Sequence, residues 1–280
     1  MVSAMPHITI NGYSTYYEFD DFTPPWLTPI TILIQHGMGR NSQFWRHWPA
    51  TLGTSWPCIR RDLPGHGGSD DPGPDYPWTM DALVSDLVGF LDRLGLQQIH
   101  FLGESTAGML GIAFAARYPE RLRSLTLCAS PTTIGPAAQE MFAFGHTDWQ
   151  TAIRTLGSYG WASKLAEIGG TMGSMSPAQR EWTLNQFGNI PDRALEGYSR
   201  LVSQTDVAPL LKQIITPTLI LAPTRSAATP MAQLLAIQQA LPGSQLVAID
   251  GEAHEIYIDR ASECMRALQD FLQSVEANLS

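Results

Sequence analysis

The sequence predicts an α/β fold: a mostly parallel sheet with helices on both faces and an inserted helical segment. Short apolar or β-branched segments alternate with segments of helical spacing through residues 1–130 and again through 213–280. Such alternation is typical of a parallel sheet covered by helices. Between these parts, residues 131–212 contain helical patterns without a clear strand. The length of 280 residues suits one large domain that holds such an insertion.

The part before residue 131 predicts a hairpin followed by alternating strands and helices. Residues 8–10 and 15–18 form the hairpin, because Asn11-Gly12 between them favours a tight β-turn. Strands are expected where apolar and β-branched residues cluster, and helices where apolar residues recur at helical spacing. The expected strands cover 29–35, 56–63, 99–102 and 125–129, and the expected helices cover 80–94 and 106–118.

Regular alternation resumes after the inserted segment, with strands at 218–222 and 245–249 and helices at 231–240 and 261–275. The insertion itself is rich in large apolar side chains that either line a pocket or pack the segment on the rest of the chain. They are Met141, Phe142, Phe144, Trp149, Tyr159, Trp161, Met172, Met175, Trp182, Phe187 and Tyr198.

The composition argues against several classes of function. Hydrophobic residues make up 44% of the chain, charged residues 15%, and the net charge is −9, as in a soluble globular enzyme. No stripe of Lys and Arg is present, so nucleic acid is not an expected partner. No apolar run approaches the ~18–20 residues of a membrane span. The segment Met1 to Pro6 lacks a basic stretch followed by an apolar core, so we expect no secretory signal.

The three cysteines, Cys58, Cys128 and Cys264, are odd in number and lie far apart in the sequence. We therefore expect reduced, buried thiols and a cytoplasmic protein. A zinc site needs clustered ligands, and none are clustered in the sequence.

One stretch predicts a nucleophile. Gly103-Glu104-Ser105-Thr106-Ala107-Gly108 lies between the strand at 99–102 and a helix, so the serine stands at a sharp turn from strand to helix. Such a turn holds a hydroxyl on a strained bend, from which it attacks a carbonyl. Gly103 and Ala107, two places either side of the serine, are small enough for the bend to close. Ser105 is the candidate nucleophile.

Two other segments supply the partners that acyl transfer needs. His36-Gly37-Met38-Gly39 ends the strand at 29–35, and a glycine-rich turn can direct backbone amides at a developing oxyanion. The amides of Met38 and Thr106 are the candidate donors; an ordinary tight turn is the alternative. His254 follows the strand at 245–249 and is the candidate general base, with a surface loop histidine as the alternative.

Together these motifs resemble the α/β-hydrolase fold family over essentially the whole chain, in its serine esterase and lactonase branch, with enol-lactonases as the most similar members. The resemblance implies an α/β-hydrolase core of residues 1–130 and 213–280 and a helical cap of residues 131–212 over the active site. It implies that residues 62–67 are a structural turn, so no catalytic role is assigned to His66. The matching stretches are 36–39, 62–69, 103–108, 215–220 and 251–254.

The acid of a catalytic triad is missing from the places where this family has it. That carboxylate orients the histidine and stabilises its imidazolium. It follows the strand at 218–222 or the strand before it, yet residues 222–230 and 128–133 contain no Asp or Glu, and its expected position falls at about Ser226. Either a carboxylate from elsewhere takes over, or a Ser–His dyad uses Ser226, Thr224 or water, or the acid is lost and activity is poor. The carboxylates considered are Asp250, Glu252, Asp206 and Asp148.

The expected activity is hydrolysis of a small or medium apolar carboxylic ester or lactone. Ser105 forms the acyl-enzyme, His254 acts as base and then acid, the Met38 and Thr106 amides hold the oxyanion, and no metal or organic cofactor is required. Amide hydrolysis is less expected, because loss of the acid costs roughly 10⁴-fold in kcat. The alternatives are a C–C bond hydrolase, a cofactor-free dioxygenase, and a non-catalytic small-molecule binder. The partner is then the small-molecule substrate, and a homodimer is one of the oligomeric states that the sequence leaves open.

Overall fold

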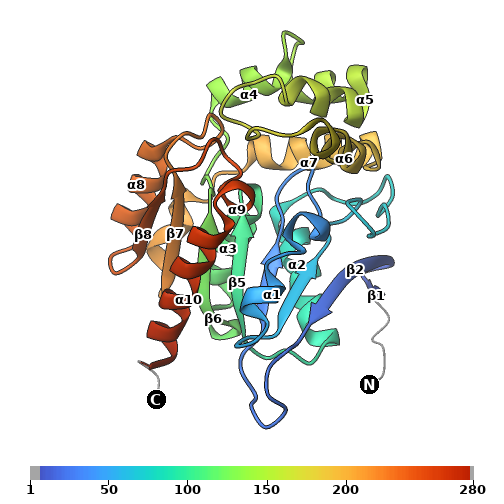
Figure 1. Ribbon diagram of the computed structural model, residues 1–280. Coiled ribbons are helices and arrows are strands. Elements are labelled where there is room, and N and C mark those ends of the chain that lie inside the picture. Colours follow the sequence, from blue (N-terminus) through green and yellow to red (C-terminus); the bar gives the residue numbers. More distant parts are fainter. Residues whose placement is uncertain (1–6, 278–280) are drawn as a thin grey trace.

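The computed structural model describes residues 7–277, which form one eight-stranded sheet with helices on both faces (Figure 1). β1 and β2 pair antiparallel, β2 pairs antiparallel with β4, and the strands from β4 to β8 are parallel. The order across the sheet is β1 (His7–Ile10), β2 (Tyr13–Asp20), β4 (Cys58–Arg61), β3 (Ile32–Gln35), β5 (Ile99–Glu104), β6 (Leu122–Cys128), β7 (Thr218–Pro223) and β8 (Gln245–Ile249). The predicted fold class is confirmed. The segment Met1 to Pro6, where we expect no secretory signal, lies outside the described residues.

The predicted elements are present, with shifted ends. Asn11 and Gly12 both have positive φ, as the tight turn of the predicted hairpin requires. The predicted strands at 29–35 and 56–63 are shorter in the structure, where β3 covers Ile32–Gln35 and β4 covers Cys58–Arg61. Pro57, directly before β4, has no N–H to donate to a neighbouring strand. Ala129, the expected last residue of the strand at 125–129, instead takes a left-handed conformation just after β6.

Two apolar layers fill the space between the sheet and its helices. On one face, α2 (Met80–Arg93), α3 (Thr106–Arg117) and α8 (Met231–Ala240) pack on the strands through side chains such as Leu87 and Ile112. On the other, α1 (Pro49–Leu52) and α10 (Ala261–Ala277) pack through Leu52 and Leu268. A short helix that the sequence did not predict, α9 (Ile256–Asp259), precedes α10. Helices on both faces leave only the ends of the parallel strands open to form a site.

Four helices lie over one end of the sheet (Figure 1). They belong to the segment that the sequence predicted to be helical, and the only pairing of strand type there among the described residues is a single bridge between Thr133 and Asp206. We call them the cap helices. They are α4 (Pro136–Ala143), α5 (Trp149–Leu165), α6 (Pro177–Gly188) and α7 (Asp192–Gln204).

Two expectations from the composition, on membrane spans and on the cysteines, can be compared with the described residues. Within residues 7–277, no helix combines the length and the apolar character needed to cross a membrane. Cys58, Cys128 and Cys264 are free and buried, as predicted.

Candidate active site

The candidate residues meet where the carboxyl ends of neighbouring parallel strands reach the cap helices. β3 pairs with β5, β5 with β6, β6 with β7, and β7 with β8. The loops that follow these strands carry Met38, Ser105, Ser226 and His254, so they lie side by side at one edge of the sheet. The chain also changes direction here, because β4 lies on one side of β3 and β5 on the other. Ligand sites of open α/β sheets form at such a switch point.

Ser105 stands in a strained turn. Its φ of 52° and ψ of −125° are values that few residues other than glycine adopt. The turn is tight because β5 and α3 nearly touch: a Cβ on Gly103 would lie 2.6 Å from the Ala107 carbonyl oxygen. The start of α3 also lies against the loop after β6, where a Cβ on Gly108 would lie 2.0 Å from Ser130 Oγ. The Ser105 N–H donates to the Cys128 carbonyl at 2.8 Å, which fixes the bend against β6. The strand, turn and helix predicted from the sequence are all present.

The loop after β3 lies against this turn. A Cβ on Gly37 would lie 2.8 Å from the Glu104 carbonyl oxygen and 3.0 Å from Ser105 Cβ, so only glycine fits. The neighbouring Met38 N–H donates to Thr106 Oγ1 at 3.1 Å, and Thr106 Oγ1 lies 3.1 Å from the Tyr198 hydroxyl. The Met38 amide therefore lies beside the serine but is occupied by the threonine hydroxyl.

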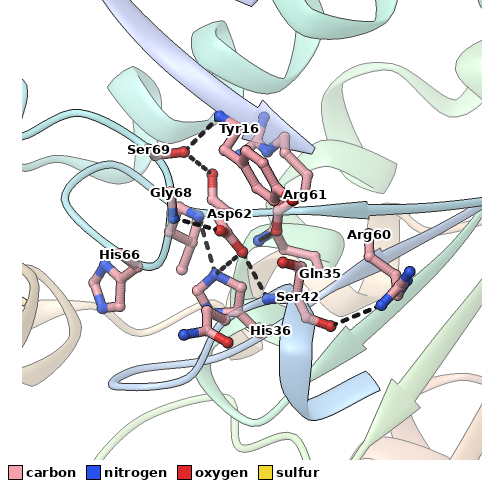
Figure 2. Close-up of polar contacts among 12 residues, drawn as sticks. Tyr16, Gln35, His36, Ser42, Arg60, Arg61, Asp62, His66, Gly68 and Ser69 are labelled. Atoms are coloured by element: carbon pink, nitrogen blue, oxygen red, sulfur yellow. Dashed lines mark hydrogen bonds and ion pairs between the residues drawn. The ribbon is translucent and has the colours of Figure 1, made fainter. Parts of the chain in front are cut away.

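Figure 2 shows why the loops after β3 and β4 keep their shape. The buried Asp62 carboxylate accepts hydrogen bonds from the Ser42 N–H at 2.6 Å and the Gly68 N–H at 2.8 Å. His36 is also buried, and its Nε2 accepts the Leu63 N–H at 3.0 Å. Burial holds the pKa of His36 well below its usual value, so the ring is a neutral acceptor. These contacts support the expectation that 62–67 is a structural turn.

His254 contacts a hydroxyl where a triad has its acid. Its Nδ1 lies 2.8 Å from Ser226 Oγ, which also accepts the Thr229 N–H at 2.9 Å. The position at which the sequence placed the missing acid is thus occupied by Ser226. A hydroxyl can donate to Nδ1 or accept from it, whereas a carboxylate only accepts, so Ser226 does not fix the tautomer of the ring.

The other carboxylates considered from the sequence have different partners. Asp250 is 70% exposed and pairs with Arg225 at 3.0 Å. Glu252 accepts the Ser174 N–H, Asp206 accepts the Ala208 N–H, and Asp148 accepts the Thr151 N–H at the start of α5. These contacts are those of loop charges and helix caps, so none of the four takes the position of the acid.

Three charged residues that were not predicted surround the histidine. Glu104 Oε1 lies 3.8 Å from His254 Nε2, and Glu104 Oε2 accepts the Gly37 N–H at 2.7 Å. Arg40 donates from Nε to Glu255 Oε1 at 2.5 Å, and its guanidinium carbon lies 4.6 Å from the centre of the Phe187 ring. All three charged side chains are buried.

Burial and these charges set the protonation of the site. Burial, and to a lesser extent the positive charge of Arg40, lower the pKa of His254 to about 4. Burial raises the pKa of Glu104 to about 7, although Arg40 and the Gly37 N–H oppose the rise. At neutral pH the imidazole is therefore uncharged, and Glu104 is the group that titrates.

Ser105 and His254 open into the same cavity, which holds about 60 Å³ of free space. Its polar side is formed by Met38, Arg40, Glu104, Ser105, Thr106, Thr171, Thr229 and His254, and its apolar side by Pro131, Ile134, Phe142, Trp149, Trp161, Leu165 and Ala228. This volume is below the roughly 300–1,000 Å³ of typical ligand pockets. A substrate of more than a few heavy atoms therefore fits only if side chains or helices that line the cavity move.

Both predicted roles of the large apolar side chains in the insertion occur. Phe142, Trp149 and Trp161 line the cavity and also pack on one another, with ring centres 4.6 to 6.0 Å apart. Phe187 is fully buried in the core, whereas Tyr159 is 48% exposed. The aromatic wall of the cavity thus comes from α4 and α5.

The sequence carried a signal for the charged residues that were missed. Glu104 is a carboxylate at the end of an otherwise apolar strand, directly before the candidate nucleophile. A carboxylate buried there requires a hydrogen-bond donor or a cation nearby. Two more charged residues lie in segments that were predicted to approach the candidate nucleophile. Arg40 belongs to the glycine-rich loop, and Glu255 follows the candidate histidine.

Comparison with known proteins agrees with this fold. A sequence model described as alpha/beta hydrolase fold matches residues 30–261. A pimeloyl-[acyl-carrier protein] methyl ester esterase from Neisseria meningitidis is 26% identical over 87% of this chain and 77% of its own length. A 3-oxoadipate enol-lactonase from Acinetobacter baylyi is 25% identical over 72% of this chain and 73% of its own. The crystal structure of the enol-lactonase from Burkholderia xenovorans LB400 superposes with a TM-score of 0.85 and 24% identity, covering 96% of this chain and 100% of that one.

Proposed function

Because the chain belongs to the alpha/beta hydrolase fold family and is an esterase- or lactonase-like hydrolase, we propose that it cleaves a small or medium apolar carboxylic ester or lactone through an acyl-enzyme on Ser105. The observation that carries the proposal is the strained serine turn in a cavity shared with His254. A hydroxyl held in this way faces the substrate, and a neutral imidazole that lines the same cavity can take its proton.

The reaction has two steps. In acylation, Ser105 Oγ attacks the carbonyl carbon while its proton moves to His254 Nε2, and the proton then passes to the departing alkoxide oxygen as the C–O bond breaks. In deacylation, water gives a proton to Nε2 and its oxygen attacks the acyl carbon, which releases the acid and returns the proton to Ser105. In a lactone the alkoxide stays attached to the acyl group, so one product leaves.

The backbone N–H groups of Met38 and Thr106 are the proposed hydrogen-bond donors to the oxyanion. Thr106 is the first residue of α3, where backbone N–H groups have no acceptor within the helix. The Met38 N–H becomes available when the Thr106 hydroxyl, its present acceptor, rotates toward the Tyr198 hydroxyl. Substrate binding and this rotation would therefore occur together.

Ser226 supports the imidazole as a neutral partner, so the site works as a Ser–His dyad. Its hydroxyl stabilises the ring orientation by one hydrogen bond but contributes no negative charge. A dyad suits an activated ester or a strained lactone, whose leaving groups need less help than the amine of an amide. The apolar wall from Phe142, Trp149 and Trp161 suits an apolar acyl or alcohol group.

The experiment is turnover of p-nitrophenyl esters of increasing acyl length and of a lactone panel by the purified protein, with Ser105→Ala as the matched control. We expect hydrolysis of short apolar esters or lactones by the parent and loss of at least about 10³-fold in kcat/KM in the variant. Equal turnover by the two proteins would contradict the proposal.

A fluorophosphonate probe distinguishes the alternatives. Covalent labelling of Ser105 in the parent is expected if the serine is activated for acyl transfer. A dioxygenase or a binding protein on the same fold has no need of an activated serine. Turnover of a substrate without labelling at Ser105 would therefore favour chemistry that does not pass through an acyl-enzyme.

A further inference from the structure

Glu104 places a carboxylate beside His254, on the edge of the ring opposite Ser226. Its Oε1 lies 3.8 Å from Nε2, whereas Ser226 Oγ lies 2.8 Å from Nδ1. Its other oxygen is fixed by the Gly37 N–H at 2.7 Å, and the side chain is 3% exposed. Both Glu104 and His254 line the cavity that Ser105 faces. The carboxylate is therefore held in place at the nitrogen that must receive the serine proton.

We propose that Glu104 is a positioning residue that stabilises the His254 imidazolium from the Nε2 side, and so replaces the charge that the missing acid would supply at Nδ1. The inference rests on the proposed function, because it needs His254 to accept a proton during catalysis. Glu104 forms no bond and keeps its charge throughout the reaction, while the proton moves from Ser105 to Nε2 and on to the leaving oxygen.

The surroundings explain why this charge matters. His254 is buried, and Arg40 opposes a second positive charge near it. A cation in such a place needs an opposite charge nearby. The negative charge of Glu255 is balanced by its ion pair with Arg40. Glu104 is therefore the carboxylate that faces the ring of His254.

The titration of Glu104 depends on the groups packed around it from several elements. Arg40 and the Gly37 N–H, after β3, lower its pKa, while burial and Glu255, before α9, raise it to about 7. The charge of Glu104 also acts on four neutral groups around it. They are His254, Tyr198 of α7, Tyr257 of α9 and Cys128 of β6.

This arrangement gives the rise of activity with pH a different origin from that in an ordinary triad, where the histidine loses a proton. The imidazole is neutral above about pH 5, because the pKa of His254 is about 4. The carboxylate of Glu104 becomes charged as the pH rises through about 7. Activity of the parent is therefore expected to rise through neutral pH as Glu104 ionises, and not as the histidine loses a proton.

The test compares kcat and KM of the parent and Glu104→Gln on a p-nitrophenyl ester from pH 5.5 to 9. Glutamine keeps an oxygen that can accept the Gly37 N–H but has no charge. We expect kcat to fall by about 10- to 100-fold at pH 8, KM to change little, and the rise near pH 7 to disappear. An unchanged or higher kcat, or a rise near pH 7 that persists in the variant, would overturn the inference.

Two further variants separate this inference from the proposed function and from a purely structural role. Glu255→Gln should keep the rise in activity and move its midpoint to lower pH, because Glu255 raises the pKa of Glu104. In a Ser226→Asp background, Glu104→Gln should cost less than it does alone, since the new carboxylate supplies the same charge; equal costs would argue against the inference. If Ser105→Ala is as active as the parent, the proposed function fails; if Ser105→Ala is inactive and Glu104→Gln is not impaired, only the inference fails.

Discussion

Ser226→Asp is expected to raise kcat/KM for ester hydrolysis by about 100-fold, which corresponds to about 2.7 kcal/mol of barrier. The residue already contacts His254 Nδ1, and an aspartate there accepts the Nδ1 proton, fixes the tautomer and stabilises the imidazolium. The Thr229 N–H that now donates to Ser226 Oγ can donate to the carboxylate, which helps to orient it. The measurement is steady-state hydrolysis of a short p-nitrophenyl ester.

Ser226→Asn is the matched control for this gain. Asparagine has the size of aspartate but no charge, and its amide can donate to Nδ1 and hold the wrong tautomer, so no gain is expected. The aspartate variant should also acquire an acidic limb between about pH 5 and pH 7, because a nearby carboxylate raises the pKa of His254 from about 4 by 1–3 units. An equal gain in both variants, or in neither, would show that the acid position has been assigned wrongly.

The second large effect is expected at the histidine. His254→Ala should lower kcat/KM by about 10³-fold, because the serine then loses the base that takes its proton. Ser105→Ala should cost a similar factor, and the double variant should be no worse than either single one, since nucleophile and base act as a unit. The measurement is kcat/KM of the three variants on one ester, with each protein first shown to be folded.

Ser226→Ala is a control with which the losses in kcat/KM of His254→Ala and Ser105→Ala can be compared. It removes a neutral hydrogen bond and no charge, so a loss of at most about tenfold is expected. If the costs of His254→Ala and Ser105→Ala multiplied in the double variant, the two residues would act independently, and the mechanism proposed for them would be wrong.

The fold could be predicted because its signals are local and repeat along the chain. Alternating apolar segments and amphipathic spacing predicted the parallel sheet, and Asn11-Gly12 predicted the first hairpin. Strand ends were less accurate; β4, for example, begins only after Pro57, which has no backbone N–H to donate. The short helix α9 has only four residues, too few for a periodic pattern to reveal it.

The site could be predicted only where a residue follows a strand of the sheet. Ser105, Ser226 and His254 each do so, and chain order alone then brings them to one edge. The cluster of Glu104, Arg40 and Glu255 depends on how three loops pack on one another, and the contact between the Met38 amide and the Thr106 hydroxyl depends on a side-chain rotamer. Neither leaves a periodic signal in the sequence.

The central claim, that Ser105 carries the acyl group, is tested most directly by the mass of the enzyme during turnover. The protein is mixed with a p-nitrophenyl ester, stopped with acid within the first turnovers and digested for mass spectrometry. We expect an acyl group on the peptide that contains Ser105, absent from Ser105→Ala and longer-lived when deacylation is slowed by His254→Ala. Turnover by the parent with no acyl adduct, or with the adduct on another residue, would contradict it.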